Sequence, residues 1–387
     1  MKNNLSKMNF LLLIFMIIYS IFGLVMILSS SSVAAVLRYE VSPNYFFMKQ
    51  LVIGVIAYII GIIILFIPTK SRIYKLFSKL IIYVVIGLLV FLFFTGIVAG
   101  GAQSWYDFGV ANFQPTEFAK LALIMYFAVY YYQLSKRKKI SFINMIYPLL
   151  LAGAMIFLVA LQPDFGGAAI IFFIASLIFI GLPIGKEHKK MVYKIIGVGA
   201  IVLGLAFILL GKTVLKSYQV SRILNYQSPC QRYAEETGYQ VCNGYIAINN
   251  GGLFGVGLGN STQKYLYLPE AHTDFIFPII CEELGIIVGI VVIIGYFIML
   301  LIILDTAKKT DNLKSSIICY GVFAFLFAHI LINTLGVLGL IPLTGVPLPF
   351  LSYGNSFNVV VIVSLFLVLR ISIENKIAME RKKIEEL

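Results

Sequence analysis

The segment from Tyr267 to Leu304, "YLPEAHTDFIFPIICEELGIIVGIVVIIGYFIMLLIIL", decides the fold class of this chain. From Phe275 onward it is almost uninterruptedly apolar, and it exceeds the about 20 residues that a helix needs to cross a bilayer. Its beginning carries Glu270, His272 and Asp274, although only 12% of the chain is charged and 60% is hydrophobic. The segment therefore predicts a membrane-spanning helix preceded by an unusually polar loop.

The composition of the whole chain of 387 residues agrees with this interpretation. Its mean hydropathy is +0.96, and it carries about half of the roughly 25% charged residues that are typical of soluble domains. We predict an all-α polytopic membrane protein that forms one domain over residues 1–387, with no soluble domain at either end. The ten expected transmembrane helices are approximately Leu11–Leu28, Leu51–Ile67, Leu80–Val98, Phe118–Tyr132, Ile143–Leu161, Gly166–Leu182, Met191–Leu210, Phe275–Leu304, Ser316–Leu340 and Tyr353–Leu369.

The distribution of basic residues predicts the orientation of these spans. Most of the 30 Lys and Arg residues fall in the loops that share a side with the N-terminus, and in the tail at about 371–387. Because basic residues collect in cytoplasmic loops, both termini are expected in the cytoplasm. The long segment at about 212–274, before the eighth span, is then extracellular. Membrane orientation thus accounts for the net charge of +13. We expect no nucleic-acid binding, because no soluble basic surface is available to hold a duplex.

The long extracellular segment contains the glycine-rich run "INNGGLFGVGLGNSTQK", Ile248 to Lys264. Apolar residues interleave with this run, which favours a loop packed at the outer membrane surface over a flexible tether. The glycines do not indicate a dinucleotide site, because no strand–helix unit surrounds them. Cys230 and Cys242 lie in the same segment. We expect them to form a disulfide, since the outside of the membrane permits oxidation; the alternative is two unpaired thiols.

Two further motifs place charged residues near the outer ends of predicted helices. In "FQPTEFAKL", Glu117 and Lys120 are three residues apart and therefore share a helix face. They are expected to form a buried ion pair, with direct substrate binding as the alternative. In "LQPDFGGA", Asp164 is expected to cap the next helix at a tight turn.

The stretch "GLIPLTGVPLPFLSYGNSFN", Gly339 to Asn358, contains three prolines and cannot form an ordinary helix. We expect a re-entrant or cavity-lining loop, since irregular backbone at membrane depth is tolerated inside protein; the alternative is a plain extracellular turn. Asp274, at the entry of the eighth span, is a candidate general base, helix cap or cation ligand. His272 is expected to make loop hydrogen bonds rather than to bind a metal, because no second histidine is nearby.

Five motifs in this order resemble those of the SEDS family (shape, elongation, division and sporulation), which includes FtsW, RodA and SpoVE. They are "GAQSWYDFG", "FQPTEFAKL", "QPDFGG", "GGLFGVGLGNSTQKYLYLPEAHTDFIFPIICEELG" and "TGVPLPFLSYG", and together they cover nearly the whole chain. The run "PEAHTDFIF" followed by "EELG" looks closer to FtsW or SpoVE, whereas "TGVPLPF" also occurs in RodA-like chains, so the resemblance leans towards FtsW. The chain departs from the family at Ser104, where arginine is frequent, and at "SYGNSF", where Asn355 and Phe357 replace small residues of "SYGGSS".

The resemblance implies a peptidoglycan glycosyltransferase that polymerises lipid II at the outer face of the bacterial cytoplasmic membrane, in cell division or elongation. It implies that Asp274 is essential and that Trp105, Glu117 and Lys120 are functional. It also implies a class B penicillin-binding protein, a transpeptidase, as partner, together with other divisome or elongasome membrane proteins.

The chemistry of glycosyl transfer suits these residues. Asp274 is a candidate base for the acceptor hydroxyl, and positive charge must stabilise the departing diphosphate. That charge is expected from Lys120, Arg222, Lys264 or a Mg²⁺ or Mn²⁺ ion, for which Asp274 is the candidate ligand. The candidate substrate-binding residues are Trp105, Glu117, Lys120, Lys264, Glu270, His272 and Ser352. A lipid II transporter and a non-catalytic divisome scaffold are the alternatives, but the acids cluster on one side and a scaffold needs no buried acids.

Overall fold

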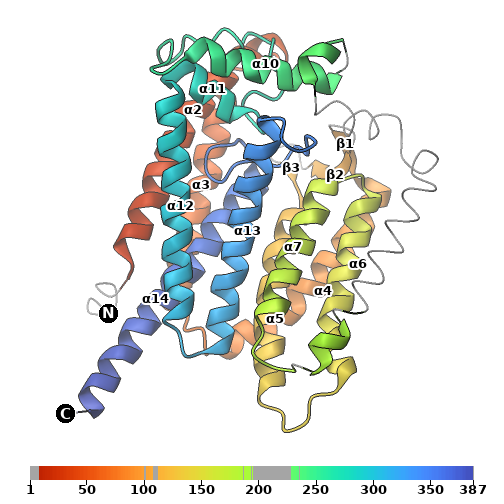
Figure 1. The fold of residues 1–387 in the computed structure, drawn as a ribbon, viewed down its shortest axis with the longest axis vertical. Coiled ribbons are helices and arrows are strands. Elements are labelled where there is room, and N and C mark those ends of the chain that lie inside the picture. Colours follow the sequence, from red (N-terminus) through yellow and green to blue (C-terminus); the bar gives the residue numbers. More distant parts are fainter. Residues whose placement is uncertain are drawn as a thin grey trace.

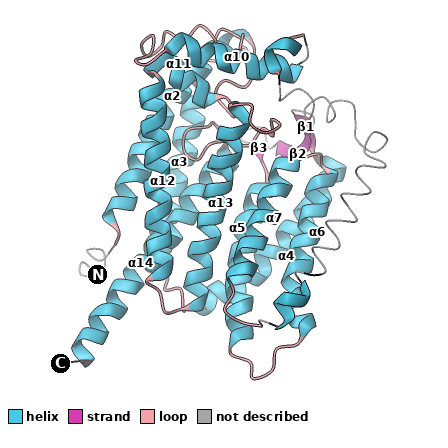
Figure 2. Ribbon diagram, in the orientation of Figure 1, coloured by secondary structure: helices cyan, strands magenta, loops and turns pink. Residues whose placement is uncertain are grey.

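The computed structural model describes residues 8–99, 102–107, 112–185, 187–192, 194, 228–234 and 236–386. Over these residues the chain is a bundle of long helices with one helix laid across its end (Figures 1 and 2). The helices are α2 (Phe10–Leu37), α3 (Tyr45–Phe66), α4 (Arg72–Thr95), α5 (Pro115–Ser135), α6 (Phe142–Leu161), α7 (Phe165–Gly181), η1 (Pro229–Arg232), α10 (Glu236–Gly251), α11 (Ile276–Leu284), α12 (Ile286–Lys308), α13 (Leu313–Val337) and α14 (Asn355–Glu385).

The predicted membrane helices agree with the described ones. Among the described residues, 7 helices are long and apolar enough to cross a bilayer, and α7 is a shorter apolar helix. Every expected span except Met191–Leu210 coincides with described helices. That seventh expected span lies almost entirely outside the described residues.

The helices differ in what surrounds them. In their most apolar windows α14 is 83% buried and α13 61%, whereas α3 is only 22% buried. The outer helices expose large apolar side chains, as lipid-facing helices do. Glycine allows α3 to approach α14 closely, since a Cβ on Gly61 of α3 would collide with the ring of Phe366 on α14. α13 and α14 therefore form the centre of the bundle.

The expectation of one continuous span over Phe275–Leu304 is wrong. Gly285 has φ +88° and separates α11 from α12. The break is fixed by a loop that crosses it: the amide of Val256 donates to the Glu282 carbonyl, and the amide of Ile286 donates to the Gly252 carbonyl. A Cβ on Gly285 would lie 2.2 Å from the Leu253 carbonyl oxygen, so only glycine fits there.

The chain also departs from the predicted all-α fold between α4 and α5. Three short strands, β1 (Ile97–Ala99), β2 (Ala102–Asp107) and β3 (Asn112–Phe113), form an antiparallel sheet in the order β1-β2-β3. Ile97 pairs with Trp105, and Tyr106 pairs with Phe113. β-branched and aromatic residues, which favour strands, are present here as Ile97, Val98, Trp105, Tyr106 and Phe113.

α10 covers one end of the bundle, called here the α10 end, and the sheet lies near the same end (Figure 1). The described part of the segment at about 212–274 is thus not a flexible tether, because it contains η1, α10 and a series of turns. A disulfide joins Cys230 of η1 to Cys242 of α10, with their Cα atoms 4.9 Å apart. The first turn of α2 and the last turn of α14 lie toward the opposite end (Figure 1).

Candidate active site

Asp274 lies at the α10 end, in a tight turn just before α11. Its side chain is largely buried, with 8% of the residue exposed. The turn is closed by Thr273 and Phe275, whose amides donate to the Glu270 carbonyl at 3.1 and 3.2 Å. In this turn Glu270 has a φ of +55°, which lies in the left-handed region that non-glycine residues rarely adopt. The turn thus fixes where the Asp274 side chain leaves the backbone.

The irregular stretch 338–354 passes beside Asp274. Its residues Leu348, Leu351 and Ser352 are buried, so the alternative of a plain extracellular turn is wrong. Gly345 has φ +70°, and a Cβ built on it would lie 3.8 Å from Oδ2 of Asp274. Glycine at this position therefore leaves the carboxylate beside bare backbone.

A cavity of about 330 Å³ opens next to the same turn. It brings together Lys264, Glu270 and His272, three of the expected substrate-binding residues, and it adds Arg38, which the sequence did not single out. Its remaining lining is apolar or small and consists of Ala34, Leu266, Leu268, Pro269 and Ala271. Asp274 is not among the lining residues. The cavity and the carboxylate are linked through Thr273, whose hydroxyl lies 2.9 Å from Oε2 of Glu270 and 3.2 Å from Oδ1 of Asp274.

His272 forms the inner wall of this cavity. Its ring lies 4.7 Å from that of Phe46 and 5.8 Å from that of Tyr353, and its carbonyl accepts a hydrogen bond from the Tyr353 amide at 2.8 Å. Burial lowers the pKa of His272 to about 4, and the nearby Glu270 only partly opposes this shift. His272 is therefore neutral near pH 7 and acts there as an aromatic and main-chain contact.

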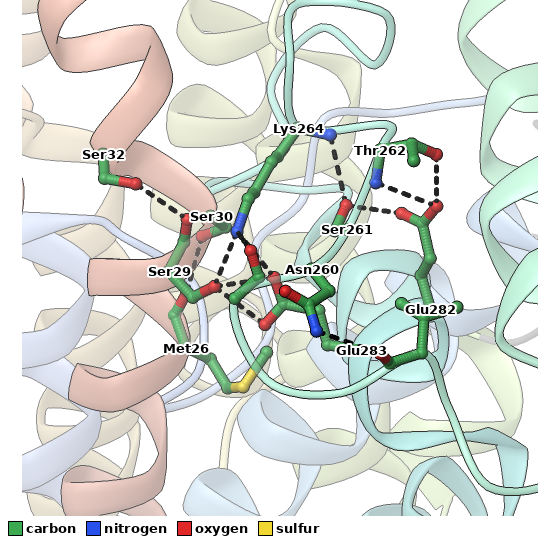
Figure 3. A network of polar contacts seen from close by, with 12 residues as sticks. Met26, Ser29, Ser30, Ser32, Asn260, Ser261, Thr262, Lys264, Glu282 and Glu283 are labelled. Atoms are coloured by element: carbon green, nitrogen blue, oxygen red, sulfur yellow. Dashed lines mark hydrogen bonds and ion pairs between the residues drawn. The ribbon is translucent and has the colours of Figure 1, made fainter.

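Lys264 reaches the cavity but is already held by other groups (Figure 3). Its ammonium lies 3.0 Å from Oε1 of Glu283, 3.3 Å from Oγ of Ser29 and 2.5 Å from the Gly259 carbonyl. Ser29 also donates to Glu283 at 2.6 Å, which joins α2 to α11. Of the two cations that line the cavity, Lys264 is therefore fixed by a buried carboxylate.

Glu282, the acid beside Glu283, binds the loop that precedes Lys264. It is fully buried and accepts hydrogen bonds from the Ser261 hydroxyl at 2.5 Å and from the hydroxyl and the amide of Thr262 at 2.9 and 3.2 Å (Figure 3). The Gln263 amide donates to it as well, at 3.3 Å. A buried carboxylate needs such donors. The acids at the end of α11 therefore hold the loop that leads into the cavity.

Glu117 and Lys120 form the expected buried ion pair. Nζ of Lys120 lies 2.6 Å from Oε1 of Glu117, and the two residues are 1% and 3% exposed. Nε2 of His329, on α13, lies 3.0 Å from the same ammonium. Sequence reasoning missed His329, although a histidine inside an apolar span is itself a signal of a buried polar partner.

Asn333, one turn after His329 on α13, was missed as well. Its side-chain amide donates to the Asp274 carbonyl at 2.7 Å and to the Val346 carbonyl at 2.8 Å. It therefore joins the turn of Asp274 to the irregular stretch. The sequence signal was present, because an asparagine four residues after a histidine lies on the same face of an otherwise apolar helix.

The remaining expected site residues lie outside the cavity lining. Trp105 is half-buried in β2, opposite Ile97. Ser352 is buried, and its hydroxyl accepts a hydrogen bond from the Leu348 amide at 2.8 Å, so it braces the irregular stretch. Asp164 caps α7 by accepting from the Gly167 amide at 2.8 Å, as expected. Arg222 lies outside the described residues.

Comparison with known proteins gives matches over nearly the full chain. The family model for FtsW, RodA and SpoVE, described as "Cell cycle protein", matches residues 9–377. The chain is similar to the probable peptidoglycan glycosyltransferase FtsW of Bacillus subtilis (strain 168), with 38% identity over 100% of this chain and 96% of the relative. It is also similar to stage V sporulation protein E of the same organism, with 32% identity over 96% of this chain and 99% of the relative.

Solved structures share the fold. A chain from a study of the "structural coordination of polymerization and crosslinking by a peptidoglycan synthase complex" aligns with a TM-score of 0.73 and 23% identity, covering 95% of this chain and 98% of that chain. The rod shape determining protein RodA of Thermus thermophilus aligns with a TM-score of 0.65 and 24% identity, covering 94% of this chain and 96% of that chain. By its family match and its full-length relatives, this chain belongs to the FtsW/RodA/SpoVE family.

Proposed function

We propose that this protein is a peptidoglycan glycosyltransferase that polymerises lipid II, with Asp274 as the general base. One observation carries the assignment of the site: Asp274 is a mostly buried carboxylate in a tight turn beside a cavity. The chain that holds it aligns end to end with a relative named probable peptidoglycan glycosyltransferase FtsW. The FtsW-like relatives favour a role in cell division over elongation.

In this proposal the carboxylate of Asp274 takes the proton of the acceptor sugar hydroxyl. The acceptor oxygen then forms a bond with the anomeric carbon of the donor, while the bond from that carbon to the diphosphate oxygen breaks. A base placed within reach of the hydroxyl typically accelerates such a step 10²–10⁴-fold. Gly345 supports this role, since it places no side chain between the carboxylate and its surroundings.

The departing diphosphate needs positive charge, for which Arg38 and Lys264 of the cavity lining are the candidates. Each lies near a carboxylate, Arg38 at 3.7 Å from Glu270 and Lys264 at 3.0 Å from Glu283, so the diphosphate would compete with these acids for them. A Mg²⁺ or Mn²⁺ ion would add to their positive charge. The described residues contain no group of three or more His, Cys, Asp or Glu suited to a metal. Glu270 and Asp274 both approach the Thr273 hydroxyl and are the carboxylates that would hold such an ion, which would supply positive charge to the departing diphosphate.

The same proposal assigns partners and orientation. A class B penicillin-binding protein is the expected partner, together with other divisome or elongasome membrane proteins. The fold similarity to a chain of a peptidoglycan synthase complex supports this assignment. In the bacterial plasma membrane the α10 end would face outward and both termini would face the cytoplasm, because the basic loops lie toward the opposite end.

The test is lipid II polymerisation by the purified protein with its transpeptidase partner, measured as glycan chain length on gels. Asp274→Asn keeps the shape of the side chain and removes its basicity, so polymerisation should fall about 10²–10⁴-fold while the protein remains folded. Asp305→Asn is the matched control, since Asp305 is an exposed acid paired with Lys309 on α12. It should polymerise at the parental rate.

Each outcome separates the candidate functions. A folded Asp274→Asn variant with the parental rate would remove the assignment of the base. Restoration of that variant by high Mg²⁺ or Mn²⁺ would show that Asp274 is a metal ligand instead. Movement of lipid II across vesicle membranes without polymerisation would identify a transporter. Stimulation of the partner with neither activity would identify a scaffold.

A further inference from the structure

We propose that Asn333 and His329 of α13 are positioning residues that hold Asp274 against the Thr344–Pro347 segment. This inference rests on the proposed role of Asp274 as the base. The two residues are separated by four positions, so they share one face of the helix. Both are buried, at 3% and 0% exposure. Each of them donates to a main-chain carbonyl of the segment that passes beside the carboxylate.

Asn333 makes the direct connection. Its amide group uses both hydrogens on main-chain oxygens, one on Asp274 at 2.7 Å and one on Val346 at 2.8 Å. The first bond orients the peptide that follows Asp274, and the second fixes the neighbour of Gly345. A Cβ on Gly345 would lie 3.8 Å from Oδ2 of Asp274. One side chain thus sets the separation between the carboxylate and the backbone beside it.

His329 fixes the next residue of the segment. Its Nδ1 lies 3.1 Å from the Pro347 carbonyl, which can only accept, so Nδ1 carries the proton. Its Nε2 then has a free lone pair and accepts from the Lys120 ammonium at 3.0 Å. Both ring nitrogens are satisfied in this one neutral tautomer. The Glu117–Lys120 pair therefore acts on the segment through His329.

Two further contacts hold the same group in place. The ring of Phe357 stacks on His329 at 4.4 Å with an interplanar angle of 24°. Phe357 is one of the residues in which this chain departs from the usual family pattern. From the other side, Gly166 of α7 lets Val346 pack so closely that a Cβ would lie 2.7 Å from its side chain. The segment is thereby fixed by α7, α13 and α14.

The first experiment replaces Asn333 by Leu, which has a similar shape and no donors. With the full-length protein and its partner, kcat for lipid II polymerisation should fall about 10- to 100-fold, as misplacement of a catalytic group by about 1 Å does. The KM for lipid II should change less than twofold, because Asn333 does not line the cavity. Asn333→Gln, which retains the donors, should recover part of kcat. Thr334→Val, a change at the adjacent and only partly buried residue on another face of α13, should leave both constants unchanged.

The second experiment separates the two contacts of His329. In His329→Asn the amide nitrogen replaces Nδ1 and keeps the bond to Pro347, whereas in His329→Gln the amide oxygen replaces Nε2 and keeps only the Lys120 contact. Positioning through Pro347 predicts that His329→Asn retains at least fivefold more kcat than His329→Gln at equal melting temperature. This pair decides the inference if Asn333→Leu does not fold.

The outcomes distinguish this inference from the proposed function. If Asp274→Asn is inactive but folded Asn333→Leu polymerises at the parental kcat, the positioning role is wrong and the base assignment stands. If KM rises and kcat does not fall, Asn333 affects binding and the inference is also wrong. If the parental protein with its partner does not polymerise lipid II, the proposed function fails first.

Discussion

At the scale of single residues, the ion pair between Glu117 and Lys120 shows how charge is tolerated inside the bundle. Both residues are nearly inaccessible, and their charged atoms lie 2.6 Å apart. Removing one partner of a buried pair leaves a charge without compensation and typically costs about 3–5 kcal/mol, whereas removing both is often nearly neutral. For the stability of the fold, each member of the pair is therefore needed mainly to compensate the charge of the other.

This cost can be measured by a double-mutant cycle. Glu117→Gln and Lys120→Met should each lower the free energy of unfolding by about 3–5 kcal/mol. The double variant should be more stable than the sum of the two losses implies. Thermal unfolding in detergent is the measurement, and Asp305→Asn again serves as an exposed control. Additive losses would show that the two side chains do not stabilise each other.

His272 gives a second prediction at this scale, on pH. Its pKa is lowered to about 4 by burial, against roughly 6.5 in an unfolded chain. Between these values the unfolded state binds more protons, so stability rises with pH. The contribution of His272 is complete above about pH 6.5 and is lost as the pH falls toward 4. Unfolding temperatures at pH 7, 5.5 and 4.5 should therefore decrease more steeply in the parental protein than in His272→Phe. Equal slopes would contradict the assignment.

At the scale of elements, α11 and α12 show what the sequence predicts and what it does not. The apolar run Phe275–Leu304 predicted a membrane helix, and α12 confirms it, but hydropathy does not mark the break at Gly285. The break depends on Leu253 and Val256, which are distant in sequence. Long apolar runs were predictable because bilayer thickness sets their length. The partners of Glu282 and Glu283 were not predictable, because tertiary contacts supply them.

The candidate site was predictable to a similar degree. Asp274, Glu270 and His272 were found because they are adjacent in sequence and polar within an apolar chain. His329 and Asn333 carried the same signal in weaker form, since each is a polar residue inside an apolar helix. Neither lies near a charged residue in the sequence of α13, so sequence reasoning missed both. Arg38 follows an apolar span on the expected extracellular side. It lies 3.7 Å from Glu270 in the folded chain, and nothing local in the sequence connects the two residues.

The disulfide of η1 and α10 gives the prediction at this scale. Cys230 and Cys242 close a loop with a sequence separation of 12, for which the chain-entropy model gives about 3 kcal/mol of stabilisation. Replacing both by Ser should lower the free energy of unfolding by about that amount. Alkylation of unreduced, denatured protein should modify only Cys281 and Cys319, which are buried free thiols. Modification of all four cysteines before reduction would show that the bridge does not form.

At the scale of the whole molecule, the first and the last described helices reach toward the same side of the bundle (Figure 1). The first turn of α2 and the last turn of α14 are both opposite the α10 end (Figure 1). Basic residues collect toward that side, among them Lys308 and Lys309 at the end of α12 and Lys382 and Lys383 near the end of α14. Both features agree with the orientation that the positive-inside rule predicts.

A reporter fusion tests this orientation. A reporter that is active only in the cytoplasm, placed after Leu387, should be active, and the same reporter inserted after Gly252 at the α10 end should be silent. A reporter active only outside the cytoplasm should give the opposite pattern. An active external reporter after Leu387 would contradict the predicted topology.

The wrapping of the loop around Glu282 has a consequence for hydrogen exchange. The amides of Thr262 and Gln263 donate to a carboxylate that solvent does not reach. Their protons can be replaced by deuterium only when the loop moves away from Glu282. Such a movement breaks several hydrogen bonds to the buried carboxylate at once. Such an opening is cooperative and rare. The amides of Thr262 and Gln263, which immediately precede Lys264 of the cavity lining, should therefore take up deuterium as slowly as those of a core helix, although this loop has no regular secondary structure.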